Sequence, residues 1–518
     1  MLSEVTSLLL LPTFWLAFIP VSLVSYVTYN RYFQGLSHVP GPWLASVSDL
    51  WRYFVVKKFR PEVEHIALHK RYGKVVRLGP RTVSVSDPAA LQTIYAPNAG
   101  FVKSDFYRVQ QTLSKGQPLL TLFTSLNEQM HARLRRSVSN AYAMSTLVQF
   151  EPLVDSTTVA FLDQLSKRFA SRPDSTLNFG AWLQYYAFDV VGELTFSKRL
   201  GFVDKGEDVE GVIASIEAML DYAAVVGQMP NFDYLMIKNP LRLLMSRLGF
   251  VKGDTPMVRF AKTRFSERYG PGGNAVEKED TPSRDFLSRF MEANKKDPSF
   301  ITQHQVLALT VANIFAGSDT TAITLRAIFY YLLKQPSDLV ALRLEIEAAK
   351  RAPENTRSDG LFNWNQVRQL PFLNAVIKEA LRCHPAAGLT LERIVPQGGV
   401  TVSGVFIPGG TIIGANAWVI HRDKDIFGDD AEQWRPQRWI EADKERRRRM
   451  ENHIFSFGMG ARTCIGKNVS LLEMYKLVPA LLNRFEIELA RPDLEWELHN
   501  AWFVKQMGFS IKIREREV

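Results

Sequence analysis

The sequence predicts a mainly α-helical protein with a small β-rich part, an α+β chain that folds as one large unit. Hydrophobic residues make up 46% of the 518 residues and charged residues 22%, which is typical of a globular protein and excludes a disordered, collagenous or coiled-coil chain. The pattern is mainly helical from about residue 127 to residue 350, whereas strand-like runs occur near 74–86, near 400–413 and at the C-terminus. No internal repeat is visible, so one body is expected although the length alone would suggest about three domains.

The N-terminal segment predicts a membrane anchor. No charged residue occurs between Glu4 and Arg31, and the run Leu8–Tyr29 is rich in Leu, Phe, Trp, Val and Ile. As a helix, this run would reach roughly 33 Å at ~1.5 Å per residue, enough to cross a bilayer core of about 30 Å. A cleaved signal peptide is the alternative, but it would carry Lys or Arg before a shorter apolar run. We therefore expect residues 1–30 to form a single uncleaved transmembrane helix.

Residues 31–45 are expected to form a stiff hinge before the body, residues 46–518. Pro40, Gly41 and Pro42 favour a rigid turn. The first basic residues follow the apolar run, which predicts a cytoplasmic body; they are Arg31, Lys57, Lys58 and Arg60. The net charge of +10 is mild for this length, and two cysteines exclude a disulfide scaffold and favour a reducing compartment.

The longest predicted helix runs over Gln303–Gln335. Thr302 with Gln305 forms a capping box at its start, and Pro336 marks its end. The segment is apolar nearly all round, so we expect the helix to run through the core. Before it, the stretch Gly270–Pro282 (GPGGNAVEKEDTP) predicts a flexible surface loop.

The centre of this helix reads Ala316-Gly317-Ser318-Asp319-Thr320-Thr321. Small residues followed by an acid and two hydroxyls are poor choices for a buried helix centre. A close helix crossing with a locally bonded Thr would explain the segment. A ligand groove beside a proton-handling pair would explain it equally well.

The segment 457–466, FGMGARTCIG, is the most informative part of the chain. It places Cys464 in a glycine-rich loop, two residues after Arg462 and before an apolar helix. A lone buried Cys is usually inert, but backbone N–H groups, a cation and a helix N-terminus all favour a thiolate here. The segment is not a dinucleotide-binding fingerprint, because the third Gly of that motif is absent. It is not expected to bind zinc, because no second Cys or His stands at ligand spacing. A single thiolate on a metal held by another scaffold remains, and that scaffold would be haem.

This loop resembles the haem-binding signature of the cytochrome P-450 superfamily, F-x-x-G-x-R-x-C-x-G, which is matched at Phe457, Gly460, Arg462, Cys464 and Gly466. Three further segments resemble motifs of that family in the correct order. They are the oxygen-binding motif at 316–320, the E-x-x-R pair at 379–382, and the F-x-P-x-R-W segment at 434–439, here WRPQRW. The anchor and the hinge resemble the microsomal eukaryotic branch, so the likeness covers the whole chain.

The resemblance implies a cytochrome P-450 fold with a long central helix over haem b. Cys464 would be the axial thiolate ligand and Phe457 would shield its sulfur. Gly460 and Gly466 would let the backbone approach the porphyrin.

On the opposite face of the haem, the oxygen-binding motif would lie beside dioxygen. Thr320 would donate a hydrogen bond to dioxygen, and Asp319 would bring protons through water. Ala316 and Gly317 would line the cofactor. Electrons would come from NADPH through a partner reductase.

The expected propionate partners depart from the common family pattern. Many members have W-x-x-x-R where this chain has His131 through Arg135, so His131 would replace Trp as a donor. Arg136 is the alternative to Arg135 if the register slips. With Arg393 and Arg462, these side chains would neutralise the propionates through charge-assisted hydrogen bonds.

Glu379 and Arg382 lie three residues apart on one predicted helix and therefore share a face. They are expected to form a buried network with Arg438 that maintains the haem pocket rather than takes part in the chemistry. The neighbouring Cys383 is expected to have no role.

The resemblance also implies partners and a location. NADPH–cytochrome P-450 reductase, with cytochrome b5 as a second electron donor, would serve a body that faces the cytosol from the endoplasmic reticulum membrane. The run Arg446–Arg449 is either a solvated charge run or a docking patch for the acidic flavin domain of that reductase. His65 and His69 are interpreted as an ordinary helix face, and no nucleic-acid partner is expected.

The segments that vary within the family and contact substrate would be 101–123, 219–236, 386–391 and 501–504. These segments are mostly apolar, so the predicted substrate is an apolar small molecule that enters from the membrane side. The side chains that they would contribute to the pocket are Phe106, Tyr107, Phe123, Tyr222, Leu389 and Phe503. The stretch Phe188–Phe202 is similar to fungal secondary-metabolism members such as pisatin demethylase. That likeness implies hydroxylation, epoxidation or O-demethylation, in biosynthesis or in detoxification.

Two alternatives remain at this point. One is a haem-thiolate enzyme that rearranges an oxygenated substrate without a reductase, which the intact Asp319–Thr320 pair argues against. The other is a non-catalytic haem-binding membrane protein.

Overall fold

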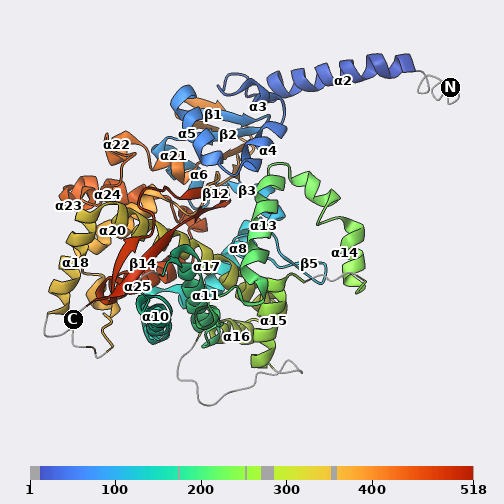
Figure 1. Ribbon diagram of the computed structural model, residues 1–518. Coiled ribbons are helices and arrows are strands. Elements are labelled where there is room, and N and C mark those ends of the chain that lie inside the picture. The colour runs from blue at the N-terminus through green and yellow to red at the C-terminus, as the bar shows by residue number, and fades with distance from the viewer. Residues whose placement is uncertain are drawn as a thin grey trace.

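The computed structural model describes residues 12–172, 175–250, 254–269, 285–351, 357 and 359–516. The predicted surface loop Gly270–Pro282 and the first residues of the predicted membrane span, 8–11, lie outside the described residues. The described chain is mainly helical, with several small sheets, as the sequence predicts (Figure 1).

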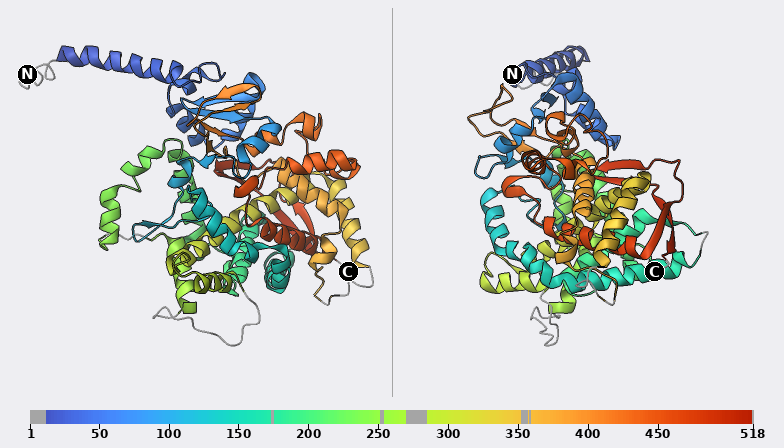
Figure 2. Two further views of the ribbon diagram at one scale, coloured as in Figure 1. Left: turned by 180° about the vertical axis from the view of Figure 1, so that it is seen from behind. Right: turned by 90° about the vertical axis from the view of Figure 1, so that its left-hand side faces the viewer.

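Helix α2, Pro12–Tyr32, projects from the body in Figure 1 and in the left-hand view of Figure 2. Its apolar side chains are exposed, Leu16 to 74% and Val24 to 64%. Among the described residues, one helix is long and apolar enough to cross a membrane, and that helix is α17, whose apolar stretch is 67% buried inside the body. The structure therefore shows the N-terminal helix but does not show it as a membrane span.

The last turn of α2 is tied to the first sheet by Arg77 of β1. Its guanidinium, fully buried, donates to the carbonyl oxygens of Asn30 at 2.6 Å and Arg31 at 3.0 Å. Gly41 in the Pro-Gly-Pro turn lies directly against this residue, because a Cβ at Gly41 would be 2.4 Å from the carbonyl oxygen of Arg77. The end of α2 is thus held by backbone contacts that need both the buried arginine and the glycine.

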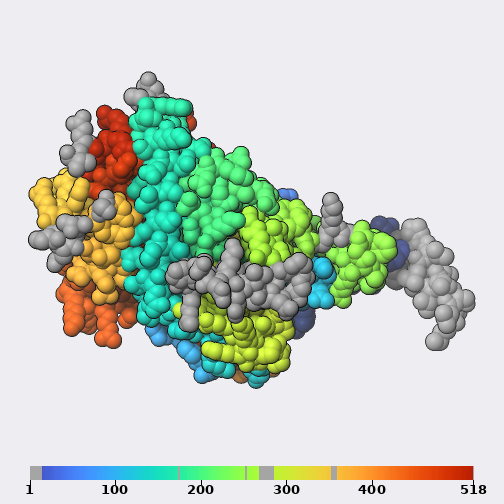
Figure 3. All heavy atoms as spheres, turned by 90° about the horizontal axis from the view of Figure 1, so that it is seen from below, coloured from blue at the N-terminus to red at the C-terminus, as the bar shows by residue number. Residues whose placement is uncertain are grey.

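The remaining helices form the body. They are α3 Trp43–Val47, α4 Leu50–Lys57, α5 Pro61–Tyr72, α6 Pro88–Tyr95, α7 Phe106–Val109, α8 Glu128–Val138, α9 Met144–Leu147, α10 Glu151–Leu165, α11 Phe179–Phe196, α12 Phe202–Lys205, α13 Val212–Val226, α14 Pro240–Arg247, α15 Pro256–Tyr269, α16 Phe286–Lys296, α17 Gln303–Lys334, α18 Pro336–Lys350, α19 Trp364–Val367, α20 Pro371–Cys383, α21 Ala417–Ile420, α22 Lys424–Phe427, α23 Arg438–Glu441, α24 Lys444–Asn452 and α25 Lys467–Arg484. Seen from below, the teal segment that includes α10 runs across this end of the body, whereas α11 is almost wholly buried (Figure 3).

The strands are short. They are β1 Val75–Gly79, β2 Thr82–Val85, β3 Val102–Lys103, β4 Leu113–Ser114, β5 Gln117–Pro118, β6 Leu177–Asn178, β7 Arg393–Ile394, β8 Val400–Val402, β9 Val405–Ile407, β10 Ile412–Gly414, β11 Phe485–Leu489, β12 Glu497–Ala501, β13 Phe503–Met507 and β14 Ser510–Glu515. The largest sheet has the order β1-β2-β10-β7-β3 and lies beside the base of α2 (Figure 1). The predicted hairpin at 74–86 is confirmed as the antiparallel pair β1–β2, and the runs at 400–413 are confirmed as β8, β9 and β10.

Helix α17 runs through the core, as its all-round apolar sequence predicts. The hydroxyl of Thr302 accepts the N–H of Gln305 at 3.2 Å and caps its start, and the helix ends at Lys334. The Gln305 half of the predicted capping box is not formed: the Gln305 side chain extends toward Leu120 and donates its amide to that carbonyl at 2.9 Å. Its closest neighbour is α11, and a Cβ at Gly317 would lie 2.7 Å from the Val191 side chain.

Candidate functional site

The loop before α25 is shaped by its glycines. The N–H of Cys464 donates to the carbonyl of Phe457 at 2.8 Å, which folds the loop back on itself. Gly458 and Gly460 have φ of +66° and +69°, which L-amino acids with side chains rarely adopt. A Cβ at Gly460 would also lie 1.7 Å from the carbonyl oxygen of Tyr95. Gly460 is therefore required by the approach of α6, a different requirement from the predicted approach to a porphyrin.

The sulfur of Cys464 lies at the meeting point of opposing electrostatic effects. Burial raises the pKa of the thiol, whereas the N–H groups of Gly466 and Lys467 and the charge of Arg135 favour the thiolate. The side chain is nevertheless accessible, so the sulfur faces a hollow that protein atoms surround. Gly466 leaves this space open, because a Cβ there would meet only the Cys464 sulfur, at 3.9 Å.

The centre of α17 supports both sequence interpretations. The helix crosses α11 closely at Gly317, and the Thr320 hydroxyl donates to the Ala316 carbonyl at 2.8 Å. Ala316 is nevertheless exposed and Thr320 half-buried, in the middle of a helix that is for the most part buried. Next to them, the Thr321 hydroxyl shares a hydrogen bond of 2.8 Å with Ser470 on α25. The central helix is thereby joined to the helix that follows the Cys464 loop.

Asp319 faces away from the side of α17 on which Ala316 and Thr320 are accessible. Its carboxylate is buried and accepts a hydrogen bond from the side-chain amide of Gln184 on α11. Burial raises the pKa of Asp319 to about 6, against the opposing effects of the Gln184 hydrogen bond and the Arg326 charge. The carboxyl group can therefore gain and lose a proton near neutral pH.

The predicted propionate partners come together. His131 on α8 is buried, and burial, then the charges of Arg462, Lys103, Arg135 and Arg393, lower its pKa to about 3. The imidazole is therefore neutral at physiological pH and can act as an N–H donor.

Within this cluster, the two arginines of α8 differ. Arg135 donates to the carbonyl of Thr463 at 2.8 Å and reaches the Cys464 loop, whereas Arg136 is exposed. Arg462 pairs with Glu128, and Arg393 donates to the carbonyl of Glu392 at 2.8 Å. The structure therefore places Arg135, rather than the alternative Arg136, in the cluster.

Lys103, on β3, is a member of the cluster that the motifs do not indicate. Its ammonium is buried over the rings of Tyr107 at 4.2 Å and Phe123 at 4.6 Å. Burial, then the charges of Arg393 and Arg462, lower its pKa well below the usual value. A lone lysine among aromatic residues was the available sequence signal.

Haem would fit these residues. The accessible Cys464 sulfur receives backbone N–H groups, as a thiolate ligand requires. The positive charges of Lys103, Arg135, Arg393 and Arg462 repel one another, and Glu128 pairs with Arg462 alone. The two propionates of haem would relieve that repulsion.

Glu379, Arg382 and Arg438 meet in the interior, as the sequence predicts. Glu379 accepts hydrogen bonds from Arg382 at 2.8 and 2.9 Å, from Arg438 at 2.9 Å, and from the indole of Trp439 and the N–H of Arg435, each at 2.9 Å. Burial alone would raise the pKa of Glu379, but the charges of Arg382 and Arg438 and these hydrogen bonds lower it. The network also fixes α20 against α23.

Aromatic side chains from separate segments meet beside the cation cluster. Phe106, Phe123 and Tyr107 lie 5.2, 5.5 and 6.0 Å from Trp502 between ring centroids. Trp502 lies in the predicted segment 501–504, although Phe503 was the residue named from it. It stands at the β12–β13 turn with a φ of +79°, which is strained for a bulky residue.

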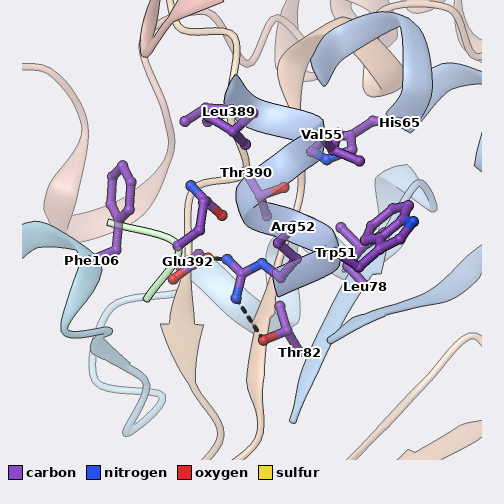
Figure 4. Close-up of a pocket in the computed structure, with 12 residues that line it drawn as sticks. Trp51, Arg52, Val55, His65, Leu78, Thr82, Phe106, Leu389, Thr390 and Glu392 are labelled. Atoms are coloured by element: carbon purple, nitrogen blue, oxygen red, sulfur yellow. Dashed lines mark hydrogen bonds and ion pairs between the residues drawn. The ribbon is translucent and has the colours of Figure 1, made fainter. Parts of the chain in front are cut away.

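Two cavities lie between this cluster and the base of α2. Figure 4 shows the smaller, where Arg52 donates to Thr82 and pairs with Glu392. The larger has a volume of about 370 Å³ and extends from Tyr26 at the end of α2 to Phe106. Neither cavity includes Cys464, so both are outlying spaces rather than the thiolate site itself.

The sequence profile of the cytochrome P-450 family matches residues 45–511. The chain belongs to the cytochrome P-450 family. It is 45% identical over 471 residues to a cytochrome P-450 monooxygenase of Aspergillus terreus, which covers 90% of this chain and 94% of the relative. It is 43% identical to the monooxygenase cicH of Emericella nidulans, over 93% of this chain and 94% of the relative. The monooxygenase mpaDE of Penicillium brevicompactum is 40% identical over 97% of this chain, which matches 58% of that longer protein.

The chain is accordingly a cytochrome P-450 monooxygenase similar to fungal members of the family. The family implies haem with a thiolate ligand, dioxygen, a redox partner and a small-molecule substrate. In this cytochrome P-450, the parts that relate to haem and dioxygen are the loop around Cys464, the central helix α17 and the cation cluster.

Proposed function

We propose that this cytochrome P-450 inserts one oxygen atom from O2 into an apolar small molecule of fungal secondary metabolism, by hydroxylation, epoxidation or O-demethylation. For hydroxylation the balance is substrate, O2, NADPH and a proton in, and hydroxylated product, water and NADP+ out. The observation that carries the proposal is the accessible, N–H-bonded sulfur of Cys464 beside the cation cluster. That arrangement suits a thiolate-ligated dianionic cofactor.

In this proposal haem b, when bound, supplies the activation of dioxygen. Cys464 is its thiolate ligand, and Phe457 shields the sulfur from water. Gly460 and Gly466 shape the loop beneath it. His131 donates a neutral N–H to the propionates, and the nearby arginines supply charge-assisted donors, namely Arg135, Arg393 and Arg462.

Asp319 and Thr320 are the proposed proton-handling pair, beside Ala316 and Gly317. Asp319 takes up a proton from water and holds it on its carboxyl group, whose pKa of about 6 suits exchange near neutral pH. Thr320 donates its hydroxyl hydrogen to the Ala316 carbonyl at 2.8 Å, so the hydroxyl must turn away from Ala316 before it can act as the expected donor. Glu379, Arg382 and Arg438 maintain the fold around the site.

The substrate is proposed to be apolar and to bind beside the aromatic cluster of Phe106, Tyr107, Phe123 and Trp502. The cavity of about 370 Å³ supports access from the base of α2, because it reaches Phe106 from Tyr26. Phe503 packs on Phe315 of α17 with ring centroids 6.3 Å apart and continues the apolar wall.

Membrane attachment is proposed for residues 1–30, with residues 31–45 as the hinge and 46–518 as the catalytic body in the cytosol, on the endoplasmic reticulum membrane. The exposed apolar side chains of α2 support it. A second exposed apolar set around α14 supports contact of the body with the same surface; it comprises Leu235, Met236, Leu241, Leu244, Leu248 and Phe250. Deleting residues 1–30 should move most of the protein from the membrane fraction to the soluble fraction.

NADPH–cytochrome P-450 reductase is the proposed electron donor, with cytochrome b5 as a second. Of the run Arg446–Arg449 on α24, Arg447 is half-buried and donates to the carbonyls of Ile440 and Ala442 at 3.0 Å. The other three arginines are exposed and support a docking patch for an acidic flavin domain.

The reduced, carbon monoxide-bound difference spectrum of membranes that contain the full chain tests the proposal. The wild type should show the Soret band of thiolate-ligated haem, and Cys464→Ser should lose it. NADPH consumption with reductase should then produce oxygenated product from an apolar substrate. A histidine-type band in the wild type would overturn the thiolate assignment, and turnover without NADPH would indicate a rearranging enzyme instead.

A further inference from the structure

A chain of buried hydrogen bonds joins α11 and α17 beside the site. The guanidinium of Arg326 donates to the side-chain oxygen of Gln184 at 3.0 Å, and the Gln184 amide nitrogen donates to Oδ1 of Asp319. Arg326 also donates through Nε and Nη2 to the carbonyl of Gly180, at 2.9 and 2.6 Å. All three side chains are more than nine-tenths buried, so water does not replace these bonds.

The spacing of the residues produces this arrangement. Asp319 and Arg326 are seven residues apart and share one face of α17, and Gly180 and Gln184 are four apart on the facing side of α11. A Cβ at Gly180 would lie 3.1 Å from Nε of Arg326, so the glycine makes room for the guanidinium. The close crossing of the two helices then brings the amide within reach of the carboxylate.

The hydrogen bonds from Arg326 through Gln184 to Asp319 can run in only one donor-to-acceptor direction. Arg has five donors and no acceptor, so the Gln184 side chain must turn its oxygen toward Arg326. Its NH2 group is then obliged to face Asp319. Oδ1 of Asp319 is consequently occupied as an acceptor, and Oδ2 is the oxygen that remains for a proton.

We propose that Gln184 and Arg326 are positioning residues that hold the Asp319 carboxyl group at α11 and direct its proton to Oδ2. This inference rests on the proposed role of Asp319 in proton supply and names two residues through which that role is controlled. Neither residue touches the reacting atoms. Their effect passes through the orientation and proton affinity of Asp319.

Few charged groups act on this carboxyl group. Arg326 is the charge that lowers its pKa, and Gln184, from α11, is neutral. From α25, Ser470 bonds to the neighbouring Thr321, and from β13 the neutral Gln506 donates to the Ile323 carbonyl. Loss of the Gln184 donor should therefore change the titration of Asp319 without a competing ionisation nearby.

Infrared titration of the holoenzyme measures this directly. The carboxyl stretching band that disappears in Asp319→Asn should titrate near pH 6 in the wild type. In Gln184→Leu its midpoint should rise by about one pH unit, a tenfold gain in proton affinity, because a donor to the ionised form is lost. Gln184→Met, another apolar replacement of similar size, is the second variant in case Gln184→Leu fails to bind haem.

The matched control is Gln164→Leu on α10. Gln164 also accepts a hydrogen bond from an arginine, Arg168 at 2.7 Å, but it does not contact Asp319. This variant should leave the Asp319 band unchanged. An unchanged midpoint, within 0.3 pH units as a rough threshold, in a folded Gln184 variant would overturn the positioning role.

A second measurement uses NADPH, reductase and 7-ethoxycoumarin as an apolar probe. Gln184→Leu should release several-fold more hydrogen peroxide per NADPH than the wild type, whereas Gln164→Leu should not. If wild-type protein consumes no NADPH with reductase, the proposed function fails, and the infrared result still decides the positioning of Asp319. Normal peroxide release in a Gln184 variant with a shifted titration would overturn the link to proton supply.

Discussion

The guanidinium of Arg462 donates two hydrogen bonds to the carboxylate of Glu128, from Nη2 at 2.6 Å and from Nε at 3.1 Å. The arginine side chain is 6% exposed and the glutamate side chain 37%, so the acid lies toward the rim and the cation toward the interior. This pair sets the orientation of Arg462 before any propionate is bound. It also leaves Arg135 and Arg393 without a carboxylate in this cluster.

We predict that Arg462→Gln accelerates haem loss by roughly ten- to a hundredfold, because one charge-assisted hydrogen bond contributes about 1.5–3 kcal/mol. The rate is measured by transfer of haem to excess apomyoglobin. Arg133→Gln is the control, since its exposed guanidinium pairs with Asp297 at 2.6 Å, away from the cluster. Equal rates for the two variants would contradict the assignment of Arg462 to the propionates.

His131 should act as a neutral donor. Burial and the surrounding cations lower its pKa to about 3, so its protonation state is constant above about pH 5. His131→Trp should retain an N–H donor and hold haem nearly as well as the wild type, whereas His131→Phe should lose haem several-fold faster. Haem-transfer rates between pH 6 and pH 8 should show no step that depends on His131. A step that disappears in His131→Phe would show that the imidazole titrates.

The Glu379 network should be sensitive to the loss of one member. Arg382→Leu leaves the buried carboxylate with fewer donors, and we expect the free energy of unfolding to fall by about 3–5 kcal/mol. Arg435→Gln is the control, because its side chain is 44% exposed and its backbone N–H to Glu379 is retained. That variant should change stability by less than about 1 kcal/mol. Comparable losses would mean that burial of the network does not set its energy.

The same network predicts a pH dependence. The folded-state pKa of Glu379 is lowered below its usual value, so its contribution to stability is present at neutral pH and is lost as the pH falls through the folded pKa. The melting temperature, followed by the Soret band, should therefore drop steeply below about pH 4. Arg382→Leu should reduce that acid-dependent loss.

Gly460→Ala tests the close approach of the thiolate loop to α6. A Cβ would lie 1.7 Å from the Tyr95 carbonyl at a φ of +69°, so both a clash and backbone strain oppose it. Gly508→Ala is the matched control, because its φ is +79° but open space surrounds it. The control should cost about 1–2 kcal/mol, the strain alone, and Gly460→Ala should cost more and lose haem. Equal melting temperatures would contradict the clash.

The motifs predicted from the sequence concern local spacing, and the structure reproduces that spacing. The E-x-x-R pair shares a helix face, and the Thr302 cap starts the central helix, because both depend on residues within one turn. The N-terminal helix was also predicted as a helix, whereas its relation to a membrane depends on surroundings that a single chain does not contain.

The contributions of Lys103, Gln184 and Trp502 could not be predicted in the same way. Each acts across the fold: Lys103 meets the cluster on α8 from β3, and Gln184 reaches Asp319 from a helix more than a hundred residues earlier in the chain. The segment 501–504 was predicted to contact substrate, but the strained turn that brings Trp502 of that segment into the aromatic cluster is specified by no residue pattern. Such contacts follow from the packing of whole helices rather than from spacing.

We expect the buried Asp319 carboxyl group to lower the free energy of unfolding at neutral pH while it serves the proposed proton supply. Its folded pKa of about 6 lies above the usual value of 3.8, so the unfolded chain releases this proton first. Stability is therefore lost as the pH rises from 3.8 to about 6 and stays lower above that range, by about 3 kcal/mol at most. Asp319→Asn removes this penalty because a neutral amide can still accept the hydrogen bond from Gln184.

We expect Asp319→Asn to melt at a higher temperature than the wild type at pH 7.5, and the difference to shrink toward pH 4. The same variant should release more peroxide per NADPH, since its side chain carries no exchangeable acid. Soret melting curves of the two holoenzymes across that pH range, recorded beside peroxide yields, measure both effects. A variant that melts lower at pH 7.5 would show that the carboxylate is stabilised in the fold, and that Asp319 is a structural acid held by Gln184 and Arg326 rather than a proton donor.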